Sequence, residues 1–73
     1  MEMTAPTMTI QLNGSPHELA GPLSLTNLLA GLGLAGKPVV VELNEVAILP
    51  RDYAATQVTA GARLEVVTLA AGG

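Results

Sequence analysis

The chain has 73 residues and a mass of 7.4 kDa, which limits it to one small domain. It contains no cysteine, so disulfide bonds and thiolate metal sites are excluded. The net charge is −3, and the three basic residues are scattered at Lys37, Arg51 and Arg63, which argues against nucleic-acid binding. A 49% hydrophobic fraction with only 12% charged residues excludes a highly charged, disordered chain.

The composition also bears on location. No stretch approaches the roughly 20 apolar residues that a membrane-spanning helix needs, so no contact with a membrane is expected. Residues 1–7 have neither the positive start nor the apolar core of a signal peptide, and we interpret them as a flexible leader. The expected location is therefore the cytoplasm.

The first predicted elements form a hairpin. Apolar and polar residues alternate strictly over residues 8–12, which indicates a half-buried strand. Asn13 and Gly14 follow, and both tolerate the positive φ that a tight hairpin turn requires. Pro16 cannot lie in a central ladder, so residues 17–20 are predicted as a short, weak second strand.

A helix is predicted after the break at Gly21-Pro22. Four leucines recur at helical spacing along one face: Leu25, Leu28, Leu29 and Leu32. Ser24 occupies the N-cap position, and Gly33 lies where a left-handed residue ends a helix at little cost. The predicted helix, residues 25–32, is only a little over two turns long, so it depends on tertiary packing.

The second half of the chain is predicted to be mostly strand. Residues 39–43 and 46–49 form a second hairpin around Asn44-Glu45, residues 51–60 form irregular turns over one end of the sheet, and residues 63–69 form the last strand. The order ββαββ…β indicates an α+β domain with a mixed sheet of about five strands and one main helix. One helix covers only one face of such a sheet, so the other face stays open.

His17, Tyr53 and the acidic residues are candidate site residues that also have ordinary structural interpretations. His17 has no nucleophile or orienting carboxylate in a recognisable motif, so it is predicted as a surface or edge-strand residue. Tyr53, the only aromatic residue, is predicted to be half-buried with its hydroxyl at the surface. The acidic residues lack metal-ligand spacing and are predicted as solvated charges, with an acidic rim facing a basic partner as the functional alternative: Glu18, Glu42, Glu45, Asp52 and Glu65.

Three apolar residues are candidates for partner docking. Val40, Val67 and Leu69 alternate with the residues that face the core, so they are predicted to point out of the uncovered sheet face. An apolar patch on an uncovered face is typical of a docking surface, and ordinary exposed aliphatic residues are the alternative.

The chain ends in Ala70-Ala71-Gly72-Gly73, which in isolation is typical of a frayed terminus. Joined to a ββαββ…β domain, this ending resembles the ThiS family of sulfur carriers, which have the β-grasp (ubiquitin-like) fold. The resemblance covers residues 8–73. Its marks are Leu12-Asn13-Gly14, Ser24-Leu25-Thr26-Asn27-Leu28-Leu29, Val41-Glu42-Leu43-Asn44, Leu49-Pro50-Arg51, Gly61 and Ala71-Gly72-Gly73.

The resemblance implies a protein that is modified by enzymes and is not itself an enzyme. It implies a β-grasp domain (residues 8–69) whose first and last strands are parallel neighbours, followed by a flexible tail (residues 70–73), whereas the flexible leader (residues 1–7) is a departure from the family. Gly73 would be adenylated and converted to a thiocarboxylate that donates sulfur for thiazole formation in thiamine biosynthesis. Gly72 and Ala71 would pass into the partner's site, because small residues fit a narrow tunnel.

The partners implied by the resemblance are an E1-like (ThiF-like) adenylating enzyme, a ThiG-like thiazole synthase, and a sulfur donor such as a cysteine desulfurase or persulfide protein. The adenylating enzyme would use ATP, and the carrier itself would bind no cofactor or metal. Two other functions stay open: the sulfur carrier subunit of molybdopterin synthase, and a non-covalent ubiquitin-like interaction module. A small enzyme is disfavoured, because no nucleophile–base pair is found.

Overall fold

Five strands form one mixed sheet in the computed structural model, which describes residues 7–69. The strand order across the sheet is β2-β1-β7-β4-β5. The strands are β1 (Met8–Leu12), β2 (Ser15–Leu19), β4 (Val39–Leu43), β5 (Val46–Ile48) and β7 (Arg63–Thr68). The architecture is the predicted α+β arrangement, a mixed five-stranded sheet with one α-helix against one face.

Strand β7 lies in the centre of this sheet. It runs parallel to β1, with Leu12 opposite Leu64, and antiparallel to β4, with Val41 opposite Val66. All other pairings in the sheet are antiparallel. The predicted parallel contact between the first and last strands is therefore confirmed.

Both hairpins turn through residues with positive φ. Asn13 and Gly14 have φ values of 50° and 83°, and Asn44 and Glu45 have values of 51° and 71°. Positive φ at both central residues is the backbone geometry whose twist matches that of the flanking strands. Glycine and asparagine adopt it readily, whereas Glu45 is a less usual choice. The Glu45 carboxylate contacts the Arg63 guanidinium at 3.0 Å, an exposed ion pair that contributes little to stability.

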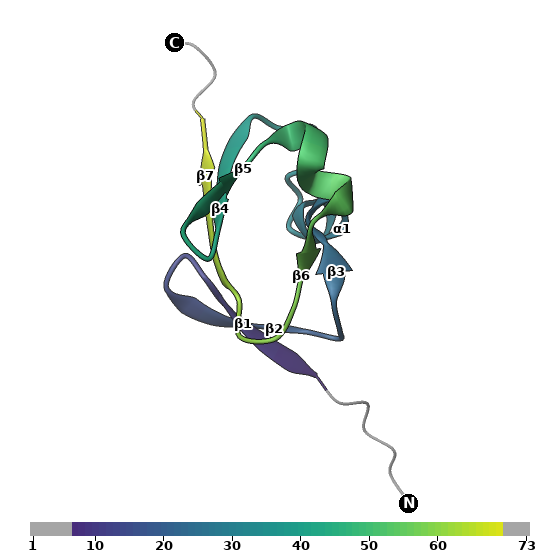
Figure 1. The fold of residues 1–73 in the computed structure, drawn as a ribbon, viewed down its shortest axis with the longest axis vertical. Coiled ribbons are helices and arrows are strands. Elements are labelled where there is room, and N and C mark those ends of the chain that lie inside the picture. The colour runs from purple at the N-terminus through teal and green to yellow at the C-terminus, as the bar shows by residue number, and fades with distance from the viewer. Residues whose placement is uncertain (1–6, 70–73) are drawn as a thin grey trace, which may run out of the picture.

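The helix α1 (Leu25–Gly31) crosses one face of the sheet (Figure 1). The Ser24 hydroxyl accepts a hydrogen bond from the Asn27 backbone N–H at 3.1 Å, as its N-cap position predicts. The helix ends one residue earlier than predicted. Leu32 is the C-cap and is only half-buried, so it is not among the most buried leucines as we expected. Gly33 follows with φ 78°, the left-handed conformation predicted for it.

The core lies between α1 and the sheet. Leu25, Leu28 and Leu29 of the helix are at most 4% exposed, which confirms three of the four predicted leucines. The buried apolar residues described by the structure are Ile10, Leu19, Leu25, Leu28, Leu29, Val41, Val58, Ala62, Leu64 and Val66. Because strand side chains alternate, the buried residues of β1, β4 and β7 all face the helix and their neighbours face solvent.

Residues 51–60 are more regular than the sequence indicated. A 3₁₀ helix, η1 (Pro50–Ala55), is followed by strand β6 (Gln57–Val58), which pairs antiparallel with β3 (Leu23–Ser24). Val58 is fully buried and forms part of the core. Strands of two residues are too short to show a period of two, so the sequence does not predict this second sheet.

Replacing Leu28 or Leu29 with alanine is expected to lower the free energy of unfolding by about 2–5 kcal/mol, because each leaves a cavity under the helix. Asn27→Ala is the matched control on the exposed face of α1 and is expected to change it by less than about 0.5 kcal/mol. Urea unfolding followed by circular dichroism measures all three. Losses below half a kcal/mol at both leucines would contradict the helical face described above.

Candidate functional site

The predicted site residues fall into two groups. Gly73, Gly72 and Ala71 lie outside the residues that the structure describes. The docking candidates lie on β4 and at the end of β7, the strand that leads into the tail. The described part of the site is therefore the surface around Leu69, the residue immediately after β7.

Val40, Val67 and Leu69 are exposed on and beside the open face of the sheet, and we call them the open-face patch. Val40 and Val67 are cross-strand neighbours, 46% and 57% exposed. They alternate with the buried pair Val41 and Val66, so they point away from the helix, as the sequence predicts. Whether a partner covers this patch stays a prediction.

Two carboxylates lie beside the open-face patch. Glu42 and Glu65 are directly opposite each other on β4 and β7, two residues along from Val40 and Val67 and on the same face. Both are exposed. Like charges directly opposite each other in a sheet are destabilising. The open face therefore carries apolar and acidic side chains next to each other.

Leu69 is tied to the body of the protein at the root of the tail. Its backbone N–H donates a hydrogen bond of 2.9 Å to the carbonyl of Pro38, one residue before β4. The side chain is 49% exposed. This hydrogen bond fixes the position of Leu69, the residue before 70–73, relative to β4.

The side chain of Asn13 holds β7 in place. Its Oδ1 accepts from the Val66 N–H at 2.8 Å, and its Nδ2 donates to the Val66 carbonyl at 3.1 Å. Its own N–H donates to the Leu64 carbonyl at 2.8 Å. The backbone pairing of β1 with β7 ends at Leu12, and the side-chain amide of Asn13 adds two hydrogen bonds to β7 beyond that point. The sequence predicts only a turn at Asn13, because nothing local indicates a contact 53 residues away.

Asn44 makes a similar contact on the other side of β7. Its Oδ1 accepts from the Arg63 N–H at 2.9 Å, and its backbone N–H donates to the Arg63 carbonyl at 2.7 Å. Each hairpin turn therefore supplies an asparagine to β7. Together these bonds position the strand that carries Val67 and leads to the tail.

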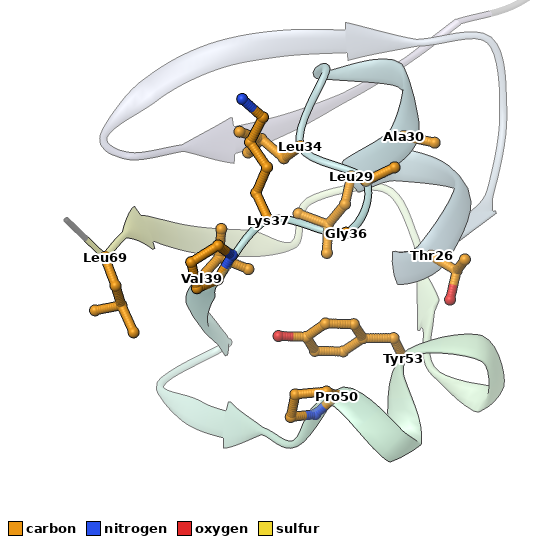
Figure 2. Close-up of a pocket in the computed structure, with 12 residues that line it drawn as sticks. Thr26, Leu29, Ala30, Leu34, Gly36, Lys37, Val39, Pro50, Tyr53 and Leu69 are labelled. Carbon is orange, nitrogen blue, oxygen red and sulfur yellow. The ribbon is translucent and has the colours of Figure 1, made fainter. Parts of the chain in front are cut away.

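A groove of about 550 Å³ opens at the end of the sheet where β7 stops. Leu29 and Ala30 of α1, Val39 of β4, Tyr53 of η1 and Leu69 line it. In Figure 2 the Tyr53 ring lies between Pro50 and the chain at Gly36, with its hydroxyl pointing toward the side of Val39. Tyr53 is half-buried, as predicted, but the groove was not predicted, since its walls come from four separate segments.

The remaining candidates lie where the sequence indicated. His17 is on β2 at the edge of the sheet and is half-buried. The five acidic residues considered above are all exposed. Within residues 7–69, no three His, Cys, Asp or Glu side chains come together as a metal site. In the same part of the chain, no helix is long and apolar enough to cross a membrane.

This chain is similar to a known protein family and to two solved structures. A family model described as the ThiS family matches residues 10–73. The crystal structure of a thiamine biosynthesis protein (ThiS) from Geobacter metallireducens superimposes with a TM-score of 0.78 at 33% identity, covering 90% of this chain and 100% of that one. A solution structure of a thiamine biosynthesis protein from the same organism gives 0.76 at 33% identity, covering 90% and 88%.

Sequence relatives are of two kinds. A thiazole synthase of Magnetococcus marinus is 38% identical over 66 residues, which are 90% of this chain but only 20% of that protein. The chain thus spans a fifth of the length of that relative. An uncharacterised protein, ycf40, of Pyropia yezoensis is 35% identical over 66 residues, covering 90% of this chain and 93% of the relative.

Asn13→Gly is expected to lower the free energy of unfolding by about 1–3 kcal/mol, because it leaves the part-buried Val66 N–H and carbonyl without their partner. Glycine also adopts the positive φ of the turn, so the substitution removes only the two hydrogen bonds of the Asn13 side chain, which we call the Asn13 bridge. Asn44→Gly is the matched control, with the same φ and one exposed side-chain bond, and about 0.5–1.5 kcal/mol is expected. Equal losses in urea unfolding would show that the turns, and not the Asn13 bridge, hold β7.

Proposed function

Because the chain belongs to the ThiS family of sulfur carriers in thiamine biosynthesis, we propose that it carries sulfur as a thiocarboxylate at Gly73. The single observation behind this proposal is the family match, which runs from β1 through the folded domain and includes the Gly72-Gly73 ending. The family consists of small carrier proteins and not of catalytic enzymes, so the chemistry at Gly73 belongs to its partners.

The proposed reaction begins with activation, because a carboxylate is a poor acyl donor at neutral pH. A Gly73 carboxylate oxygen attacks the α-phosphorus of ATP on an adenylating enzyme, forming an acyl-adenylate and releasing pyrophosphate. The terminal sulfur of a persulfide donor then attacks the acyl carbon, and AMP leaves. A second thiol cleaves the resulting acyl disulfide, so the thiocarboxylate is released while the two thiol sulfurs become a disulfide.

The proposed partners follow from this sequence of steps. A ThiF-like adenylating enzyme supplies the activation, a cysteine desulfurase or persulfide protein supplies sulfur, and a ThiG-like thiazole synthase accepts it. The chain is similar to a segment that makes up one fifth of a thiazole synthase, and this similarity supports a thiazole synthase as the sulfur acceptor. The structural neighbours, both thiamine biosynthesis proteins, favour this role over the molybdopterin alternative.

The open-face patch is the proposed docking surface for the adenylating enzyme. It lies on the strand that continues into the tail, so an enzyme that binds it is already close to residues 70–73. Glu42 and Glu65 beside the patch suit a basic surface on that enzyme. The expected interface is apolar at Val40 and Val67 and ionic around them.

Deleting Gly73 is expected to reduce adenylation about 100-fold or more, because a shift of about 3.3–3.6 Å takes the carboxylate out of attack geometry. Gly72→Ala is expected to do less harm, through its added Cβ alone, and bulkier residues more. ATP–pyrophosphate exchange measures adenylation, and intact mass shows whether one oxygen has been replaced by sulfur.

The tail variants should unfold at the same temperature as the parent chain, because every buried core residue of the described part precedes Leu69. An unchanged unfolding temperature would show that slower adenylation comes from the altered tail and not from a disrupted fold. Equal adenylation rates with and without Gly73 would overturn the carrier proposal.

Val40→Asp with Val67→Asp is expected to weaken binding to the adenylating enzyme at least about tenfold, equivalent to about 1.4 kcal/mol. The substitutions remove the apolar contact and place charge where the interface is desolvated. Gln11→Asp adds a charge to the open face of β1, outside the patch, and is the matched control. Binding of the parent chain should also weaken as ionic strength rises, since its acidic flank is exposed. Unchanged affinity in the double variant would remove the patch from the interface.

A further inference from the structure

Strand β7 loses its neighbour on one edge before it ends. Its pairing with β1 reaches only as far as Leu12 opposite Leu64, because the chain then turns into β2. Beyond this turn β7 runs on alongside β4 as far as Thr68, which lies opposite Val39 (Figure 1). The last part of β7 is therefore an edge of the sheet on the β1 side, although the strand is central along its first part.

The hydrogen bonds of β7 show which backbone groups lie on this edge. Residues of an antiparallel pair alternate between bonding to the neighbouring strand and pointing their N–H and C=O away from it. The Leu69 N–H donates to the Pro38 carbonyl on the β4 side, at 2.9 Å. The N–H and C=O of Val66 bond instead to Asn13 on the β1 side. By this alternation, the N–H and C=O of Thr68 point to the side that β1 has left.

The place beside Thr68 is open to another chain. Within residues 7–69, β4 is the one strand that pairs with β7 at Thr68, and Thr68 itself is exposed. The Asn13 bridge to Val66 comes just before it on the same edge. Backbone N–H and C=O groups on an exposed strand edge are a template for pairing with another extended chain. A strand added here would lie in line with β1, directly after the Asn13 side chain.

The outer strands of the sheet are protected in ways that this edge is not. On β2, Pro16 has no N–H to donate and Glu18 carries a charge, and both features discourage pairing with another strand. β5 is only three residues long, and the chain leaves it for η1, which begins with Pro50. Residues 67–69 are Val-Thr-Leu, with neither proline nor charge, and the first two are β-branched residues that favour strands.

The sequence after Leu69 also favours recognition through the backbone. Residues 70–73 are Ala-Ala-Gly-Gly, so no side chain there is larger than a methyl group and none carries a charge or a hydrogen-bonding group. A protein that positions these residues has mainly their backbone N–H and C=O groups to bind. An extended segment that pairs with Thr68 is already aligned with the backbone that follows.

We propose that the adenylating enzyme adds an extended segment of its own chain to the edge of β7 at Thr68. The inference rests on the proposed function, in which this enzyme takes up residues 70–73 and activates Gly73. Thr68 lies between Val67 and Leu69 of the open-face patch, so the added strand borders the proposed docking surface. The segment accepts a hydrogen bond from the Thr68 N–H, donates one to the Thr68 C=O, and continues beside the tail.

Thr68→Pro tests this pairing, because proline removes the N–H that points toward the added strand and leaves the bonds to β4 in place. Thr68→Val is the matched control, since it keeps the N–H and the β-branched shape and loses only an exposed hydroxyl. Calorimetry measures binding of the full chain to a ThiF-like enzyme. Thr68→Pro is expected to raise Kd at least about tenfold, and Thr68→Val to change it less than about twofold. Both variants should unfold at the parental temperature.

Hydrogen exchange of the ¹⁵N-labelled parent chain gives a second measurement that needs no substitution. In the free chain the Thr68 amide is expected to exchange faster than the Leu69 amide, because the latter is bonded to Pro38. In the complex with the enzyme, exchange at Thr68 is expected to slow at least about tenfold, because its N–H then has a partner.

The two measurements separate this inference from the proposed function. If the parent chain is adenylated, parental affinity in a folded Thr68→Pro variant or unchanged exchange at Thr68 in the complex would overturn the inference alone. A parent chain that neither binds the enzyme nor is adenylated would overturn both. Protection of the Thr68 amide that rises with the concentration of the carrier alone would place a second copy of the chain on this edge, and would also overturn the inference.

Discussion

A strand in the centre of a sheet must satisfy its backbone groups along both edges, and in this protein β7 carries that requirement. It pairs with β1 of the first hairpin along one edge and with β4 of the second hairpin along the other, so it joins the two halves of the sheet. Leu64 and Val66 then close the core beneath α1. Asn13 extends the short parallel ladder with its side chain, which keeps β7 bonded where β1 has already turned away.

The position of β7 also organises the site. Because side chains alternate along a strand, the same segment that buries Leu64 and Val66 presents Glu65 and Val67 on the open face. The strand then delivers the chain to Leu69, whose N–H is bonded to Pro38. One strand therefore positions part of the core, Val67 of the open-face patch and Leu69 in this member of the ThiS family.

Local signals in the sequence were sufficient for most of the fold. Strict alternation over residues 8–12 and the leucine spacing of residues 25–32 each predicted the correct element and the correct buried face. Asn13-Gly14 and Ser24 predicted the first turn and the helix start, because their conformations and hydrogen bonds involve near neighbours. Leu32 is less buried than predicted, because the helical periodicity of the sequence continues through the residue that caps the helix.

Other features depend on residues far apart in the sequence, and local patterns could not reveal them. The β3–β6 pair joins two-residue strands more than 30 positions apart, and the groove is formed by segments from both halves of the chain. The sequence by itself determined the five segments of the main sheet, the segment of α1, the open sheet face, and the glycine ending that resembles the ThiS family. Only the tertiary structure decided that Asn13 bridges to Val66 and that Tyr53 and Leu69 line one groove, because these contacts exist only once β7 is in place.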